Sequence, residues 1–101
     1  MKHFVVIVKY KAIPEVMDEL RPKHREYLQK GYAEKLLLVS GPQPTRQGGV
    51  VVCRAKSLED INQFFKSDPY KIADVAEYEF IEFTPVSHQK FLAEWLNAVS
   101  D

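Results

Sequence analysis

His24 is the first candidate for chemistry, because its side chain interrupts an otherwise apolar helical stripe. It belongs to the segment RPKHREYLQK, residues 21–30, whose spacing predicts a helix. The other members of the stripe are Val16, Leu20, Tyr27 and Leu28. An imidazole on such a face needs a polar partner. Two interpretations stay open, a core histidine bonded to a backbone acceptor and a general base at a cleft edge, and the stripe alone favours the first.

Asp68 is the second candidate, in the segment SDPYKIA. Aspartate is a favoured N-cap and proline a favoured first helical residue, so Asp68-Pro69 is typical of the start of a short helical turn. The functional alternative is that Asp68, or its backbone, meets His24 from a neighbouring helix and fixes its tautomer. That contact would make a carboxylate-oriented general base. Spacing alone does not choose between the two.

Apolar runs predict four strands, over residues 4–8, 36–39, 48–55 and 76–84. The glycine pair at the start of the third run, Gly48-Gly49, suits a hairpin turn, and we expect this run to pair antiparallel with the second.

Helical spacing predicts a first helix from Pro14 to a stop at Gly31. Pro22 should kink this helix or split it, with the main segment starting near Arg21. Ser57 is expected to cap a second helix. A final short helix is expected over residues 88–99, with Phe91, Leu92, Trp95, Leu96 and Val99 on one side.

The resulting order, β-α-β-β-α-β plus a C-terminal helix, predicts a ferredoxin-like α+β fold in one domain, residues 1–101. Three of the four strands are apolar on both faces, yet two helices cover only one face of such a sheet. We therefore expect a homodimer in which two sheets face each other, with Trp95 and its neighbours sealing or extending the interface.

Composition and motifs argue against several function classes. The 14 basic residues are balanced by 14 acidic ones, so we expect no nucleic-acid partner. The three histidines, at positions 3, 24 and 88, lack metal-ligand spacing, and His3 and His88 are expected to be half-exposed structural residues. No metal and no cofactor are expected, since phosphate loops and dinucleotide fingerprints are missing from the sequence.

The compartment is predicted from two further observations. Cys53 stands alone in an apolar run, as a buried thiol in a reducing compartment would. The N-terminal apolar run ends at Val8, too short for a membrane span and without a cleavage site. We expect a cytoplasmic protein with no membrane partner.

Taken in order, the motifs RPKHREYL, LLLVSGPQP, a glycine-opened strand, SLEDINQFFKSDPY and EYEFIEFTP resemble the YciI-like family over residues 4–85. The resemblance implies a dimeric α+β barrel protein with a histidine-aspartate pair, by match His24 and Asp68. It implies that the backbone of Gly41 and Pro42 lines the same cleft and that Tyr70 is the aromatic residue after the proline.

The sequence departs from the family pattern at Asp74, where glycine is usual, and in a short QPTRQGG segment. These departures put the cleft wall and the contacts made by loops in question. A dehydrochlorinase in the family suggests cofactor-independent lyase, isomerase or hydrolase chemistry on a small cyclic or aromatic metabolite. Arg21 or Arg46 would then anchor an anion. The alternative is a non-catalytic module for ligand binding or dimerisation.

Overall fold

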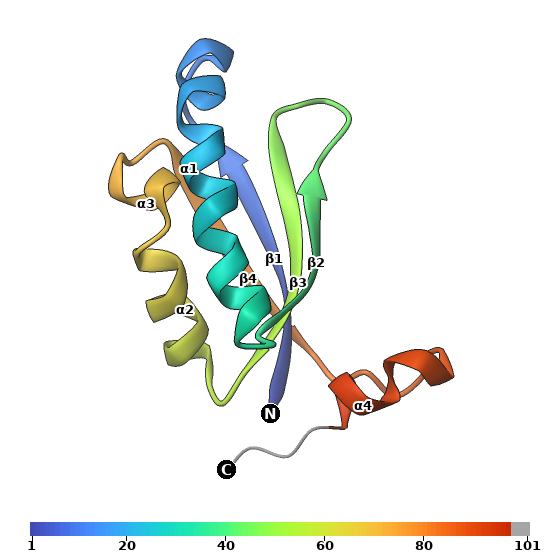
Figure 1. Ribbon diagram of the computed structural model, residues 1–101. Helices are drawn as coiled ribbons and strands as arrows, with labels where there is room; N and C mark the ends of the chain where they lie inside the picture. Colours follow the sequence, from blue (N-terminus) through green and yellow to red (C-terminus); the bar gives the residue numbers. More distant parts are fainter. Residues whose placement is uncertain (98–101) are drawn as a thin grey trace.

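Four strands form one antiparallel sheet in the order β2-β3-β1-β4 (Figure 1). The strands are β1 (Lys2–Tyr10), β2 (Leu37–Pro42), β3 (Gly48–Ala55) and β4 (Ala76–Phe83). This computed structural model describes residues 1–97. β1 is central and pairs antiparallel with both β3 and β4, while β2 pairs with β3. The ferredoxin-like α+β prediction is confirmed.

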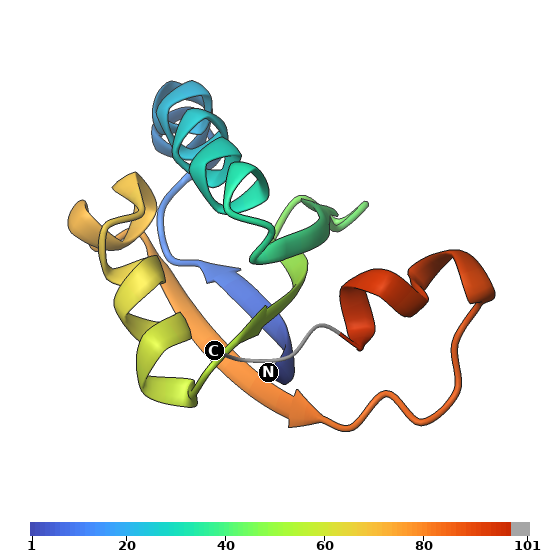
Figure 2. The same cartoon turned by 60° about the horizontal axis from the view of Figure 1, so that its bottom comes forward.

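Three helices cover one face of this sheet, namely α1 (Pro14–Ala33), α2 (Leu58–Lys66) and α3 (Pro69–Ile72) (Figures 1 and 2). Pro14 opens α1 and Glu15 lies in its first turn, as the sequence predicted. Ser57 caps α2 by accepting a hydrogen bond from the amide of Asp60. Tyr27 of α1 donates a 2.6 Å hydrogen bond to the Phe64 carbonyl oxygen, which ties α1 to α2.

The predicted split of the first helix at Pro22 is wrong, because α1 continues through this residue to Ala33. Pro22 is exposed on the outer side of the helix. Its missing N–H leaves the carbonyl of Asp18, an exposed residue, without that intrahelical donor. The long helix therefore carries side chains along one side of the sheet from residue 14 to residue 33.

The core lies between the helices and the sheet. Its largest members with almost no exposed area are Phe4, Val6, Met17, Cys53, Ile61, Phe65 and Tyr70. The predicted burial of Cys53 is confirmed, and this burial raises the pKa of its thiol to about 12. The core therefore consists mainly of alternate residues of the strands and of the residues on one face of each helix.

Gly48 and Gly49 are the first residues of β3, so their predicted place in the hairpin turn is wrong. The turn is formed by residues 43–47 instead. A Cβ atom at position 48 would collide with the carbonyl oxygen of Val8 on the paired strand. Glycine is therefore needed here because two backbones approach closely, and not because a turn requires it.

The other face of the sheet carries apolar side chains that no helix of the first 83 residues covers (Figure 2). Val39, Ile81 and Phe83 are 55%, 45% and 37% exposed there. The strand register aligns Val5 with Val52 on one neighbour and with Ile81 on the other, so these residues share this face. We call this surface the open face: Val5, Ile7, Val39, Val50, Val52, Ile81 and Phe83.

The C-terminal segment crosses one end of the open face as a 3-10 turn, Lys90–Leu92, and the short helix α4 (Ala93–Leu96). Trp95 packs on the guanidinium of Arg54 and donates to the Lys35 carbonyl oxygen at 2.9 Å. Arg54 donates to the same oxygen and to the carbonyl of Trp95. The rings of His3 and Trp95 meet edge to face, and His3 is 6% exposed, so its predicted half-exposure is wrong.

The predicted final helix is shorter than the sequence indicated. Phe91 is 82% exposed, so it does not share the buried side with Leu96, and the prediction for this residue is wrong. The predicted position of Val99 lies outside the described residues. A single turn of helix docks by Trp95 and Leu96, with no continuous stripe of the expected length.

Candidate active site

The side chains of His24 and Asp68 meet between α1 and α3. The Nδ1 atom of His24 lies 2.8 Å from Oδ1 and 2.9 Å from Oδ2 of Asp68. The histidine comes from the middle of α1, and the aspartate is the N-cap residue of α3. Both helices lie on the same face of the sheet, as the βαββαβ order requires (Figure 1). Residues 44 positions apart are thus placed in direct contact.

Asp68 is completely buried and receives two further hydrogen bonds. The backbone amide of Tyr70 donates to Oδ1 at 3.0 Å, and the hydroxyl of Tyr78 donates to Oδ2 at 2.8 Å. An ionised carboxylate only accepts hydrogen bonds, and these groups are donors. Burial, together with the negative charge of Asp68, raises the pKa of Tyr78, so its phenol keeps the proton that it donates.

This arrangement assigns the tautomer of His24. With Asp68 as the acceptor, Nδ1 carries the proton, and Nε2 is the unprotonated nitrogen of the neutral ring. Nε2 has no hydrogen-bond partner among the described residues. An imidazole oriented by a buried carboxylate, with a free Nε2, has the geometry of a general base.

Tyr70 covers one face of the His24 ring. The two rings are stacked with centroids 4.0 Å apart and an interplanar angle of 8°. Burial raises the pKa of the Tyr70 hydroxyl to about 12, and this hydroxyl has no partner among residues 1–97. Stacking holds the imidazole plane fixed while Asp68 holds its edge.

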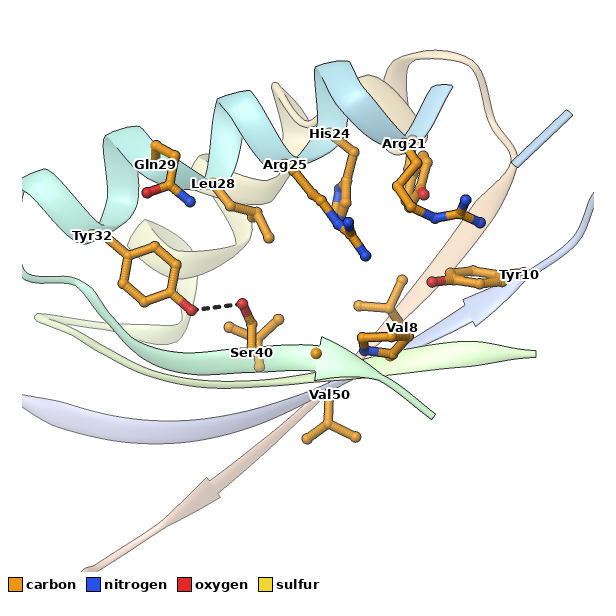
Figure 3. A pocket seen from close by; sticks show the side chains of 15 residues that line it. Val8, Tyr10, Arg21, His24, Arg25, Leu28, Gln29, Tyr32, Ser40 and Val50 are labelled. Carbon is orange, nitrogen blue, oxygen red and sulfur yellow. Dashed lines mark hydrogen bonds between the residues drawn. The ribbon is translucent and has the colours of Figure 1, made fainter. Parts of the chain in front are cut away.

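His24 lies in the wall of a cavity of about 440 Å³ between α1 and the sheet (Figure 3). The His24 and Arg25 side chains point from α1 toward the sheet, and Val8 and Ser40 rise from the strands below (Figure 3). The Tyr32 and Ser40 hydroxyls share a 2.6 Å hydrogen bond across one end of the space. The His24 side chain is 13% exposed and Asp68 is not exposed at all, so only the histidine of the pair meets the cavity.

The structure brings Arg21, Gly41, Pro42 and Tyr70 to the walls of this cavity together with His24. Arg46 does not line it, which contradicts its expected role as an anion anchor in this cavity. It lies in the β2–β3 turn with a positive φ of 62°. Asp74 is one of the departures from the family pattern. Its carboxylate lies 2.7 Å from the Lys11 ammonium group, and neither residue lines the cavity.

Several cavity residues were missed from the sequence. Those on α1 are Arg25, Gln29 and Tyr32, and those on the strands are Tyr10 and Ser40. The signal for the helical ones was present, because positions 21, 25, 29 and 32 recur at the three- and four-residue spacing of His24 and Leu28. The basic residues Arg21, Lys23 and Arg25 fit a solvated helix face at least as well as an anion site from the sequence alone, and two of the three line the cavity.

Within residues 1–97, no group of three or more His, Cys, Asp or Glu side chains is placed to hold a metal ion. No helix in this part of the chain is long and apolar enough to cross a membrane.

The fold and the cavity define a ferredoxin-like α+β protein with a histidine-aspartate pair at its cavity wall. The model of the YCII-related domain family matches residues 1–84, and the chain belongs to this family. Among curated protein sequences, none matches the chain.

Two solved structures share the fold. One is a 5-chloro-2-hydroxyhydroquinone dehydrochlorinase from Burkholderia phenoliruptrix in complex with 2,5-dihydroxybenzoquinone. Its sequence is 19% identical to this chain and its TM-score is 0.62. The match covers 87% of this chain and 97% of the dehydrochlorinase chain. The other is described as an antibiotic biosynthesis monooxygenase. It is 15% identical with a TM-score of 0.58, over 84% of this chain and 99% of its own. At these identities the likeness concerns the fold.

Proposed function

We propose that this protein is a cofactor-independent enzyme that removes a proton from a small cyclic or aromatic molecule, with His24 as general base. The observation that carries the proposal is the His24–Asp68 pair at the wall of a cavity, with Nδ1 bonded to the buried carboxylate and Nε2 free. A buried structural pair would have no need of a cavity beside the ring. The neighbouring dehydrochlorinase, which shares the fold, is an enzyme acting on a substituted hydroquinone.

In the proposed step the Nε2 lone pair takes a proton from an O–H or C–H bond of the substrate, and the electron pair of that bond stays on the substrate. The resulting imidazolium faces Asp68, whose negative charge stabilises it. Lyase, isomerase and hydrolase reactions can each begin in this way. A positioned general base contributes about 10² to 10⁴ in rate. The backbone of Gly41 and Pro42 shapes the opposite wall of the cavity.

The test is a screen of small carboxylates, lactones and quinols, followed by proton NMR in D₂O for product formation or loss of a C–H signal. For any compound that turns over, His24→Gln should abolish the reaction while circular dichroism and oligomeric state stay as in the wild type. His88→Gln, which changes an exposed histidine outside the cavity, is the control. Full turnover by the His24→Gln protein would eliminate the mechanism.

We further propose that the protein is a homodimer joined through the open face. Its exposed valine, isoleucine and phenylalanine side chains support this, because monomers rarely leave such a contiguous apolar surface in water. Val39→Glu and Ile81→Lys, at opposite edges of the open face, should each weaken the dimer. Light scattering of the wild type at low micromolar concentration provides the check. A wild-type monomer that binds no hydrophobic dye would contradict the proposal.

A further inference from the structure

The charged side chains on the walls of the cavity are all of one sign. Arg21 and Arg25 line it, and no aspartate or glutamate is among the lining residues of the described chain. Asp68 lies behind His24, completely buried, with its oxygens occupied by three donors. A cleft lined by one sign of charge raises the local concentration of ligands of opposite charge.

The two arginines differ in how far their charge is already balanced. Arg21 donates to the Asp18 carboxylate at 2.7 Å on the same helix. Arg25 forms no ion pair among residues 1–97. Its guanidinium turns from α1 into the space beside His24 (Figure 3). Among the described side chains that line the cavity, Arg25 is therefore the charged one without an ionic partner.

The position of these arginines along α1 bears on His24. Residues 21 and 25 are four positions apart, which is a rise of about 6 Å along the axis of α1. His24 lies between them along this axis. Proton transfer to Nε2 would give an imidazolium that is paired with Asp68, so the guanidinium of Arg25 would remain the positive charge without an ionic partner in this space. A bound anion would pair with that guanidinium and offset its charge beside the imidazolium.

The remaining walls are apolar or aromatic, formed mainly by Val8, Tyr10, Leu28, Val51 and Tyr70. We infer that the ligand of this cavity is a small ring-bearing monocarboxylate, with its carboxylate on Arg25 and its ring against these walls. A guanidinium binds a planar carboxylate through two parallel hydrogen bonds. One unbalanced charge matches a monoanion better than a dianionic phosphate. This inference deepens the proposed function by naming the substrate class of the same site.

The test is a ¹H–¹⁵N NMR titration of the full chain with benzoate, benzamide and phenyl phosphate. Benzamide has nearly the shape of benzoate without its charge. Benzoate should bind about 10-fold or more tightly than benzamide, and Arg25→Gln should remove that advantage while leaving benzamide binding as it was. Arg25→Lys should keep part of it, because lysine retains the charge but not the planar fork. Arg46→Gln, a matched change outside the cavity, should have no effect.

The inference would be overturned if benzamide bound as tightly as benzoate, if Arg25→Gln left benzoate affinity intact, or if no benzoate bound up to about 50 mM. Tighter binding of phenyl phosphate than of benzoate would reject the monocarboxylate class. Benzoate binding should persist in His24→Gln. If Arg25-dependent binding holds while no compound turns over through His24, the proposed function fails and the ligand class stands.

Discussion

Tyr70 touches both members of the histidine-aspartate pair: its ring stacks on His24 at 4.0 Å, and its backbone amide donates to Asp68 at 3.0 Å. The amide bond exists because Asp68 caps α3, where Tyr70 is the second helical residue. The stack exists because the same first turn of helix directs the Tyr70 ring against α1. A capping motif therefore fixes the distance and the tilt of the pair together.

Removal of the Tyr78 hydroxyl and removal of the Tyr70 hydroxyl should affect stability differently. Tyr78→Phe deletes a donor to a buried carboxylate and should lower the free energy of unfolding by about 1.5 to 3 kcal/mol. Tyr70→Phe deletes a hydroxyl that has no partner among the described residues, so stability should be unchanged or raised. Urea unfolding of both proteins measures the difference. Equal losses in the two variants would show that the Tyr70 hydroxyl has a partner of similar strength.

Loss of the Asp68 side chain should destabilise the protein more than loss of an ordinary helix cap. Ser57→Ala removes one exposed capping bond and should lower the free energy of unfolding by about 1 kcal/mol. Asp68→Ala removes a cap and also leaves His24 and Tyr78 without their buried acceptor. It should lower the free energy of unfolding by about 3 kcal/mol or more. Chemical denaturation of the two variants under one set of conditions compares them. A similar loss for both would mean that the pair adds nothing to folding.

Two glycines provide a matched test of backbone packing. Gly48→Ala places a methyl group against the Val8 carbonyl oxygen, which the sheet holds in place, and should destabilise the protein by about 1 to 3 kcal/mol. Gly41→Ala meets nothing within 4 Å and should change stability by less than about 0.5 kcal/mol. Thermal unfolding compares the variants. A neutral Gly48→Ala would mean that β1 and β3 separate more easily than their register indicates.

The buried His3 should make stability fall on acidification. Burial, followed by the nearby N-terminal charge and that of Arg54, lowers the pKa of His3 from its usual 6.5. The unfolded chain then binds a proton in the interval below pH 6.5 that the folded chain does not, so the free energy of unfolding decreases as the pH falls through it.

The check is the loss of stability between neutral and mildly acidic pH in the wild type and in His3→Gln. The variant should lose less over this interval, whatever its stability at neutral pH. An identical pH dependence in both proteins would contradict the expected shift of His3.

The order of strands and helices was predictable because apolar runs mark the strands and because prolines and capping residues mark the ends of helices. The same order made a meeting of His24 with Asp68 possible, since both helices lie on one face of a ferredoxin-like sheet, and the resemblance to the YciI-like family singled out this pair. The part played by Tyr78 was not predictable, because it depends on which face of β4 turns inward. Its pairing with Val8 places it on the helical side, and a slip of one residue would have turned it away.

Other misses have equally local causes. In the sequence, Arg25 is typical of a solvated helix face. Its place in the wall of the cavity is visible only in the three-dimensional structure. The contact between Gly48 and Val8 joins two strands far apart in the sequence, so no local pattern marks it. The end of the chain was misjudged because apolar residues at helical spacing say nothing about what they pack on. There, a hydrogen bond from Trp95 to the Lys35 carbonyl fixes the geometry.

The hydrogen bonds among Arg54, Lys35 and Trp95 join the C-terminal segment to the rest of the chain. The family model ends its match at residue 84, yet a chain shortened there would leave the buried guanidinium of Arg54 without one of its two acceptors and His3 without its aromatic cover. The residues beyond the match thus belong to the cooperative unit, and a fragment cut at the family boundary should unfold at lower temperature.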